Sequence, residues 1–430
     1  MKINNVKDLC DFIFLLERKY KLLDLKLNDV YIWHYYRMNI YYQLAVRCGI
    51  LEKPHLKNNK KAFISKIKSL LNVMKFCLFR NSFLSNNGPV DVAIFEHNRS
   101  CKVDNEFVDI YSDHIKDELE SAGTSFALLD CPYNYKHSKT KNNQERIFLD
   151  FIYTYSRIHS IFNPVKFSVS DVKLIRAIES DINEHLNIIV NLESIFKSGI
   201  KRFKSLQPQF KLLFKKLEIK ELLIVVSYGF YDVISAAKEL GIKVTELQHG
   251  IISKYHLGYN FNDCNFSKAY LPDELICWST SWKEVVGTNF SKVTVKDFRY
   301  QKNQINKYLD QNIDRKAITV ISQGAIGIDI ANYVQKNYSL YFSQADNVFF
   351  KLHPSEFSIK SDFKFLELLP NLKIMTDEID LYELLANSYT VFGVFSTVLF
   401  EAESMGCDVK LMPIQGVENV SAHPTFKLMP

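Results

Sequence analysis

Short apolar runs bounded by polar or turn-forming residues alternate along the chain with stretches whose apolar residues recur at helical spacing. The runs have the length and the apolar continuity of strands that are covered on both faces of a sheet. They comprise residues 92–95, 126–129, 222–226, 243–247, 274–277, 292–295, 317–321, 348–351, 372–374, 390–393 and 409–411. Strands that alternate with helices predict an α/β fold with parallel sheets and helices on both faces.

The patterns between these runs predict helices and one exposed loop. Helices are expected over most of residues 6–50, where Leu, Tyr and Trp are frequent, and at about 112–122, 147–219 and 231–240, with a loop at 132–146. A second series of strands and helices starts near Leu271. We therefore expect two Rossmann-like domains facing each other across a cleft, residues 1–265 with an extra helical N-terminal region and residues 266–430.

Composition is that of a globular protein with more than one core. A chain of 430 residues exceeds one ordinary domain, and 47% hydrophobic with 24% charged residues excludes a disordered or fibrous chain. The sequence contains no run of about 18 uncharged apolar residues, and its charged start predicts no signal peptide. Eight scattered cysteines with no CxxC pair indicate reduced thiols in a cytosol and predict no metal site.

The net charge of +6 is unevenly distributed. Residues 53–80 carry eight Lys or Arg and no acid, with apolar residues interleaved at helical spacing, and a second basic stretch covers 197–216. A basic amphipathic helix suits peripheral contact with an anionic membrane surface, and a solvated helix face is the alternative. We expect no nucleic-acid partner, because no nucleic-acid-binding motif accompanies these charges.

The first candidate cluster, Glu246-Leu247-Gln248-His249-Gly250, follows an apolar strand. Ligands of parallel sheets gather beyond the carboxyl ends of the strands. Gly250 is expected to permit a turn that a side chain would block, which leaves His249 at the mouth of the sheet. An imidazole there can remove a proton from an acceptor hydroxyl. An ordinary loop histidine is the alternative.

The second cluster is Lys351-Leu352-His353-Pro354-Ser355-Glu356. Pro354 ends the strand and restricts His353 to an extended conformation, which directs the imidazole to the crevice and allows it to donate to a phosphate. A helix start with Pro in its first turn, capped by Ser355 and Glu356, is compatible with this role.

The third cluster is Ser396 and Thr397, which follow an apolar strand and open a helix. Backbone N–H groups at a helix N-terminus and two hydroxyls can hold a phosphate, whereas an isolated Ser at this position is commonly only a helix cap. Glu401 lies one turn further on and is a candidate partner of a ribose hydroxyl.

Further candidates lie at other strand ends. Gln323 and Gly324 are expected to line a nucleotide pocket, and His97 and Arg99 the acceptor side. Asp232 opens a helix and is a candidate acid, base or nucleophile, with a helix-capping carboxylate as the alternative. The sequence has no Walker A lysine, no GxGxxG fingerprint and no nucleophile elbow.

The order of these clusters resembles a group of bacterial surface-polysaccharide transferases. The group includes the bacterial sialyltransferases, the capsule-type Kdo transferases and the CDP-glycerol glycerophosphotransferases, with GT-B folds, an HP motif and an S-[ST] pair. His353-Pro354 and Ser396-Thr397 match those motifs, and the resemblance implies that they bind the donor's phosphate. The sialyltransferases carry an acidic motif where this chain has Gln248-His249-Gly250, which looks more like the W-H-G of the glycerophosphotransferases and implies His249 as base.

The resemblance implies a metal-independent glycosyltransferase without a cofactor, whose C-terminal domain binds a nucleotide-sugar donor and whose N-terminal domain takes the acceptor. The expected donor is a CMP-linked acidic sugar such as a sialic acid or Kdo, and the expected acceptor is an oligosaccharide or lipid-linked glycan of capsule, lipopolysaccharide or O-antigen. A CDP-alditol phosphotransferase of the same fold is one alternative. A non-catalytic nucleotide- or glycan-binding protein is the other.

Overall fold

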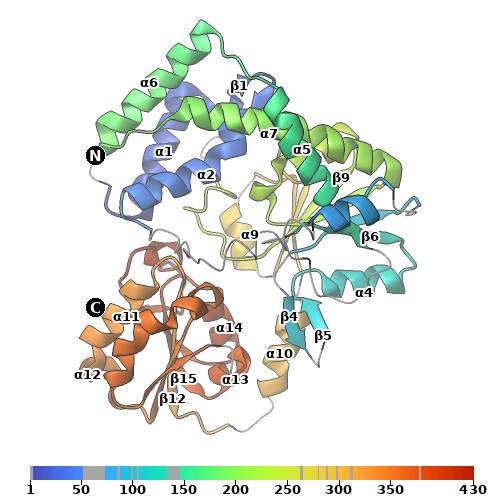
Figure 1. Ribbon diagram of the computed structural model, residues 1–430. Helices are drawn as coiled ribbons and strands as arrows, with labels where there is room; N and C mark the ends of the chain where they lie inside the picture. Colours follow the sequence, from blue (N-terminus) through green and yellow to red (C-terminus); the bar gives the residue numbers. More distant parts are fainter. Residues whose placement is uncertain are drawn as a thin grey trace.

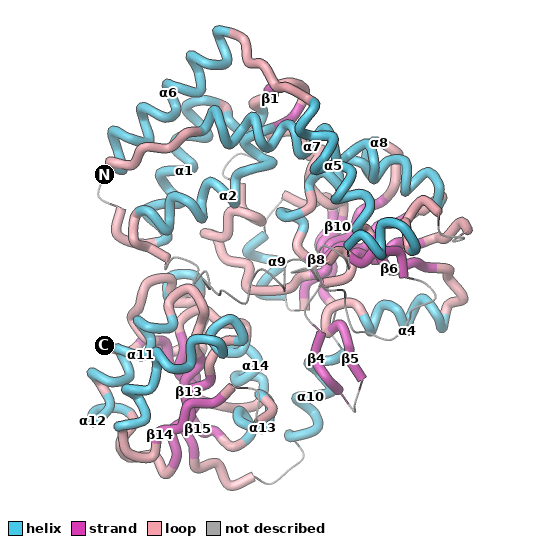
Figure 2. The backbone as a smooth tube through the Cα atoms, viewed as in Figure 1, coloured by secondary structure: helices cyan, strands magenta, loops and turns pink. Residues whose placement is uncertain are grey.

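Two separate sheets form the framework of the chain. The computed structural model describes residues 3–51, 73–84, 88–97, 100–103, 106–132, 137, 146–261, 265–278, 280–286, 289–296, 299–309, 313–376 and 379–430. Figure 1 shows two lobes, coloured blue to yellow and orange to red, and Figure 2 shows the strands of each lobe among helices. The expected α/β fold of two Rossmann-like domains, the arrangement called GT-B, is confirmed.

The N-terminal sheet has the strand order β11-β10-β9-β8-β3-β6-β7, and each neighbouring pair is parallel. Both β3 and β6 are buried along their whole length, as their continuous apolar runs predict. The strands are β3 (Val92–Phe95), β6 (Phe126–Asp130), β7 (Arg146–Phe148), β8 (Glu221–Val225), β9 (Lys243–Leu247), β10 (Glu274–Cys277) and β11 (Lys292–Val295). The helices are α4 (Asp113–Ser121), α5 (Asp150–Phe162), α7 (Leu192–Leu217), η2 (Ser227–Gly229), α8 (Tyr231–Glu239) and α9 (Thr280–Val286).

The C-terminal sheet has the order β14-β13-β12-β15-β16-β17 and is also parallel throughout. Its strands are β12 (Ala317–Ile321), β13 (Asn347–Lys351), β14 (Leu372–Met375), β15 (Ser388–Gly393), β16 (Asp408–Leu411) and β17 (Lys427–Leu428). The helices of this part are α10 (Arg299–Leu309), α11 (Gly327–Lys336), α12 (Tyr338–Tyr341), η3 (Pro354–Leu368), α13 (Leu381–Ala386), α14 (Val398–Ser404) and η4 (Val417–Asn419).

The expected boundary between residues 265 and 266 is wrong for the sheets. β10 pairs with β9, with Ile276 opposite Leu247, and β11 pairs with β10, so both strands extend the N-terminal sheet. The chain enters the second sheet only at β12. An alternation of strands and helices has the same pattern whether the next strand extends a sheet or starts one, because only long-range pairing distinguishes the two.

The extra helical region at the N-terminus is confirmed. α1 (Val6–Tyr20), α2 (Ile32–Arg47) and α6 (Val169–Leu186) share one apolar core with α7, which also packs on the sheet. Short elements complete this region, namely η1 (Leu22–Asp24), β1 (Lys26–Leu27) and β2 (Val30–Tyr31).

A buried ion pair joins these helices to the loop that follows β9. Arg37 Nε lies 2.6 Å from Glu17 Oε1, and both side chains are almost fully buried. Trp33 Nε1 donates to the same carboxylate at 2.7 Å. Arg37 Nη1 also donates to the carbonyl oxygens of Leu257 and Asn260. Because several hydrogen bonds satisfy both charges, the pair can compensate its desolvation and hold the loop in place.

Four short pairings depart from the expected pattern. β7 falls where a loop was expected to lead into a helix. Its first residue, Arg146, is charged, so the strand lacks the continuous apolar run that predicts a buried strand. That guanidinium is buried between the carboxylates of Glu96 and Asp130. β4 (Ser100–Val103) and β5 (Glu106–Asp109) form an antiparallel pair, as do β1 and β2, and β17 has only two residues.

The basic stretch at 53–80 lies outside the described residues up to residue 72, so membrane contact there stays a prediction. Residues 73–79 are helical and expose Met74, Leu78 and Phe79. No helix among the described residues is long and apolar enough to cross a membrane.

Candidate functional site

The strand order of each sheet marks one place where a ligand crevice is expected. The order reverses between β3 and β8 in the N-terminal sheet and between β12 and β15 in the C-terminal sheet. Loops beyond the carboxyl ends of strands diverge at such a point and leave a crevice. A cavity of about 510 Å³ lies between the two domains there. Its lining contains His249, Gly250, Gln323, Gly324, His353, Ser396 and Thr397.

The C-terminal wall is built by three neighbouring strands. β13, β12 and β15 lie side by side, so the loops that follow them meet at one edge of the sheet. The side-chain oxygen of Gln323, after β12, accepts a hydrogen bond from the N–H of Phe395, after β15, at 2.9 Å. Ser322 Oγ donates to Glu356 Oε1 at 3.0 Å and joins the β12 and β13 loops. Gln323 therefore braces the loop that carries Ser396.

His353 holds the start of η3 as well as lining the cavity. Its φ and ψ of −68° and 146° are the extended conformation expected before Pro354. The His353 imidazole accepts from the N–H of Ser355, while Glu356 accepts from the N–H of His353 at 2.7 Å, which completes a capping box. His353 Nδ1 also lies 2.7 Å from Ser355 Oγ. The capping and cavity-lining positions thus coexist in one residue.

Gly324 makes room for this arrangement. A Cβ at position 324 would lie 2.2 Å from Ser355 Oγ and 3.3 Å from His353 Nδ1. A side chain there would displace the Ser355 hydroxyl and crowd the imidazole. Gly250 differs from expectation, because its φ is not in the left-handed region and a Cβ there would meet no atom within 4 Å. Its turn does not require glycine, and the space that it leaves open belongs to the cavity.

Ser396 and Thr397 enter the cavity from the turn between β15 and α14, and both are half-buried. Ser396 Oγ accepts from the N–H of Val398 at 3.3 Å, so it also serves as a local cap. The Thr397 hydroxyl makes no capping hydrogen bond. α14 has only seven residues and therefore a short helix dipole. The turn before it contributes mainly the two hydroxyls to the site.

His249 lies between two tyrosines on the opposite wall. Tyr228 Oη is 3.3 Å from His249 Nε2, and Tyr259 Oη is 3.4 Å from Nδ1. Tyr259 Oη donates to Glu246 Oε1 at 2.8 Å, and that oxygen also accepts from the N–H of Ser227. Glu246 and Tyr259 are fully buried, and burial raises the pKa of Glu246 to about 7. Glu246, Tyr259 and His249 thus form a chain from the core to the cavity.

A strained residue shapes the turn that carries Tyr228. Val226 follows β8 with φ 68° and ψ 78°, a left-handed conformation that is an outlier for a β-branched residue. Such strain persists only where the surroundings hold it, and it concentrates at functional sites. The strained turn directs the N–H of Ser227 to Glu246 and the hydroxyl of Tyr228 to His249.

The remaining predicted residues occupy other positions. His97 follows β3, and its ring centroid is 6.4 Å from that of His249. Pro354 is exposed and does not line the cavity, and Arg99 lies outside the described residues. Glu401 is half-buried beside Tyr382 of α13 and Asp380, which precedes that helix, rather than in the lining. Burial of its carboxyl raises its pKa to about 7.

Asp232 is also set back from the cavity. Its carboxylate is buried, accepts from Tyr35 Oη at 2.9 Å and lies 3.8 Å from Arg202 Nε. Burial raises its pKa. It also accepts from the N–H of Val233 in the first turn of α8, in keeping with the alternative of a carboxylate at a helix start.

Sequence reasoning missed several residues of the site. Tyr228 lies in the short turn after β8, and Tyr259 lies in a loop with no periodic pattern. Tyr41 and Tyr42 line the cavity from α2, where a Tyr-rich helix was the only signal. Asn419 lines the cavity from the C-terminal domain and accepts a 2.6 Å hydrogen bond from Ser253 of the N-terminal domain.

The charge of the cavity is unusual for a phosphate-binding site. No Lys, Arg, Asp or Glu is present among the described residues that line it, so its polar groups are imidazoles, hydroxyls, amides and backbone groups. In the described part of the chain, no group of three or more His, Cys, Asp or Glu could hold a metal ion.

Comparison with known proteins adds structural neighbours only. No protein-family model and no curated protein sequence matches the chain. It is similar to UDP-GlcNAc 2-epimerase from Methanocaldococcus jannaschii, with 11% identity, a TM-score of 0.45 and coverage of 79% of this chain and 88% of the other. For MurG from Acinetobacter baumannii the identity is 10% and the TM-score 0.44, with coverage of 79% of this chain and 86% of the other. For the Streptomyces sp. SF2575 glycosyltransferase SsfS6 the identity is 10% and the TM-score 0.38, with coverage of 79% and 87%. Values this low transfer no activity.

The raised pKa of Glu246 gives a prediction for stability. The folded state holds a proton on Glu246 up to about pH 7, whereas a carboxyl with the ordinary pKa of 4.5 has released it. Stability therefore falls as pH rises between about 4.5 and 7. Replacing Glu246→Gln removes this term, so the melting temperature of the variant relative to the parent should rise across that interval.

Thermal unfolding at half-unit pH steps measures the difference. Glu239→Gln, which replaces an exposed carboxylate on α8, is the matched control and should follow the parent. A constant difference between parent and Glu246→Gln from pH 4.5 to 7 would contradict the raised pKa.

Proposed function

We propose that the chain is a glycosyltransferase that moves a sugar from a nucleotide donor to a glycan acceptor of a bacterial surface polysaccharide. The observation that carries the proposal is the cavity between the domains, in which His249 shares one space with His353, Ser396 and Thr397. A proton acceptor on one wall and phosphate-binding groups on the other are the two components that direct transfer requires.

The C-terminal wall is proposed to hold the donor. The phosphate that leaves with the nucleotide is proposed to contact the imidazole of His353 and the hydroxyls of Ser396 and Thr397. Gly324 has no side chain, which allows the backbone there to approach the donor closely. The position of Gln323, which braces Phe395, makes it a support of this wall. Pro354 fixes the conformation of His353. Glu401 is retained as a candidate ribose partner, which requires it to turn away from α13 on binding.

A CMP-linked acidic sugar, such as a sialic acid or Kdo, is the proposed donor. A sugar linked to CMP carries one phosphate, whereas sugars linked to UDP or GDP carry two. The described lining offers imidazoles and hydroxyls without Lys or Arg, which suits the smaller charge. It also lacks the carboxylates that commonly bind Mg²⁺, so the proposed transfer uses hydrogen-bond donors in place of a metal.

The N-terminal wall is proposed to activate the acceptor. His249 takes the proton of the attacking hydroxyl as that oxygen bonds to the anomeric carbon of the donor and the bond to the phosphate oxygen breaks. Tyr228 and Tyr259 orient the His249 ring, and Tyr259 is itself held by its hydrogen bond to Glu246. His97 is proposed to contact the acceptor beside His249.

A CDP-alditol phosphotransferase is the second candidate, and the histidine in the position of the base favours it. Attack would then occur at phosphorus instead of carbon, with His249 and His353 keeping their roles. Incubation with CMP-, CDP-, UDP- and GDP-linked donors tests both candidates. We expect release of CMP from a CMP-sugar. Release of CMP from CDP-glycerol would select the phosphotransferase, and binding of no nucleotide would contradict both.

The hydroxyl pair gives a prediction for donor binding. Thr397→Val keeps the shape of the side chain and removes a hydroxyl that does not cap the helix. A hydrogen bond to a charged group contributes about 1.5–3 kcal/mol, so the dissociation constant for the nucleotide should rise by about 10- to 100-fold. Isothermal titration calorimetry measures it, and the Ser396→Ala/Thr397→Ala variant should bind more weakly still.

Ser404→Ala, at the far end of the same helix, is the control and should bind as the parent does. Unchanged binding by Thr397→Val would remove that residue from the phosphate site.

The proposed base gives a prediction for turnover. His249→Asn should retain nucleotide binding and lose about 10²–10⁴ in kcat, because a general base contributes that much. The parent should show an ascending limb of rate near neutral pH that the variant lacks.

Asp232→Asn provides the discriminating comparison, since Asp232 is buried behind Tyr35. It should keep most of the activity if the protein folds normally by circular dichroism. Loss of activity in Asp232→Asn together with full activity in His249→Asn would assign the chemistry to the carboxylate.

A further inference from the structure

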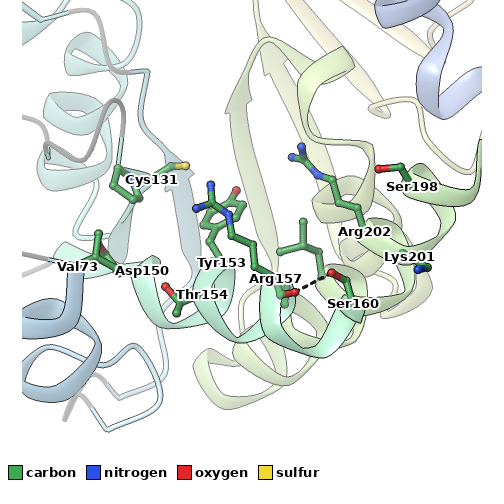
Figure 3. A pocket seen from close by; sticks show the side chains of 13 residues that line it. Val73, Cys131, Asp150, Tyr153, Thr154, Arg157, Ser160, Ser198, Lys201 and Arg202 are labelled. Atoms are coloured by element: carbon green, nitrogen blue, oxygen red, sulfur yellow. Dashed lines mark hydrogen bonds between the residues drawn. The ribbon is translucent and has the colours of Figure 1, made fainter. Parts of the chain in front are cut away.

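A second cavity, of about 520 Å³, lies within the N-terminal domain (Figure 3). It opens between α5 and α7, two helices that pack against each other. Cys131 and Pro132, which follow β6, also line it. The carboxyl end of β6 lies at the same edge of the sheet as the carboxyl end of β9, which carries His249. The two cavities have no lining residue in common.

Among the described residues, three cations line this second cavity. Arg157 extends from α5, and Lys201 and Arg202 belong to α7. Figure 3 shows the guanidinium groups of Arg157 and Arg202 on either side of the same space. Arg202 Nε is 3.8 Å from Asp232. Neither Arg157 nor Lys201 forms an ion pair with a described carboxylate, so their charge is available to a ligand.

One carboxylate lines the cavity among the described residues, and a histidine compensates it. Asp150 Oδ2 lies 3.1 Å from His137 Nε2. His137 also contacts Asp130 through Nδ1 at 3.0 Å. Although burial acts to lower it, the hydrogen bonds that the imidazole donates to these two carboxylates, together with their negative charges, raise the pKa of His137 to about 9. His137 therefore carries a proton at neutral pH, and the cavity keeps its positive charge.

Hydroxyl groups complete the lining. Thr154, Ser160 and Ser198 belong to the lining and are at least partly exposed. Ser160 Oγ donates to the carbonyl of Arg157 at 2.7 Å, so it retains acceptor capacity. Cations among hydroxyls match a ligand that is both anionic and rich in hydroxyls, because guanidinium groups bind phosphate and carboxylate through paired hydrogen bonds.

The distance from the proposed base fits an extended acceptor. β9 and β6 are separated by three inter-strand steps, through β8 and β3. At about 4.8 Å a step, their carboxyl ends lie roughly 14 Å apart. A group bound near Cys131 would therefore belong to a part of the acceptor well removed from the hydroxyl that reacts at His249.

We propose that this cavity is an acceptor subsite that holds a phosphate or carboxylate group of a sugar residue distant from the reacting one. The assignment rests on the proposed function, because it takes His249 as the point of attack. Arg157 and Lys201 bind the anion, Arg202 adds charge while it holds Asp232, and the hydroxyls contact the sugar. The enzyme would accordingly select an acidic acceptor.

Titration calorimetry with small probes tests this proposal. Glucose 6-phosphate presents a phosphate, glucuronic acid a carboxylate, and glucose neither. The parent should bind at least one charged probe at least tenfold more tightly than glucose, and the tighter of the two identifies the anion. Arg157→Gln/Lys201→Gln should lose that preference. Lys173→Gln/Lys215→Gln, which removes the same charge outside the cavity, should keep it within about twofold.

Two results would overturn the proposal, and they differ. A parent that binds nucleotide but shows no preference for either charged probe over glucose, or a preference that survives Arg157→Gln/Lys201→Gln, would refute the subsite. A parent that binds a charged probe but no nucleotide would remove the acceptor assignment through failure of the proposed function.

Discussion

The common direction of the strands is the constraint on which the site depends. Every neighbouring pair in both large sheets is parallel, so each sheet gathers its carboxyl ends at one edge. In the C-terminal sheet that edge brings together the loops after β12, β13 and β15, which are far apart in sequence. In the N-terminal sheet it brings His97 of the β3 loop beside His249 of the β9 loop. The cavity forms where these two edges meet.

The polar groups around the cavity are held by other polar groups. Glu246 reaches His249 through Tyr259, and Gln323 reaches the Ser396 loop through Phe395. Arg37 and Glu17 hold the loop after β9 from the side of the N-terminal helices. Each support is a side chain with a hydrogen-bond partner, and these bonds fix the orientation of the groups that face the ligand.

The local sequence was sufficient to predict strand bounds and cavity-lining residues where a strand is apolar and is followed by a polar loop. β3, β9, β10, β11 and β12 have the bounds that their apolar runs predict, and the residues after β9, β12, β13 and β15 line the cavity. The sequence does not show which strands pair over long range, so β10 and β11 were assigned to the second sheet although they extend the first. β7 was missed because its first residue, Arg146, is charged. The carboxylates that pair with this guanidinium belong to Asp130 of β6 and to Glu96, which follows β3.

The direction in which a side chain points could not be predicted from the sequence either. Glu401 follows Thr397 by one helical turn, which suggested a shared face, yet its carboxyl lies beside Tyr382 of α13. Tyr259 is ten residues beyond His249 in a loop without periodicity, and only the folded loop places its hydroxyl near the imidazole. The second cavity depends on α5 and α7, whose pairing no local pattern specifies.

The loops at the carboxyl edge of the C-terminal sheet are proposed to bind the donor nucleotide in the cavity between the domains. Amide hydrogen exchange with and without CMP measures this directly, because bound ligand slows exchange where it contacts the chain. Protection is expected at residues 323–325, 353–356 and 395–398, with no change in the loop after β14. Protection confined to other segments, or none at saturating CMP, UMP, GMP and AMP, would contradict it.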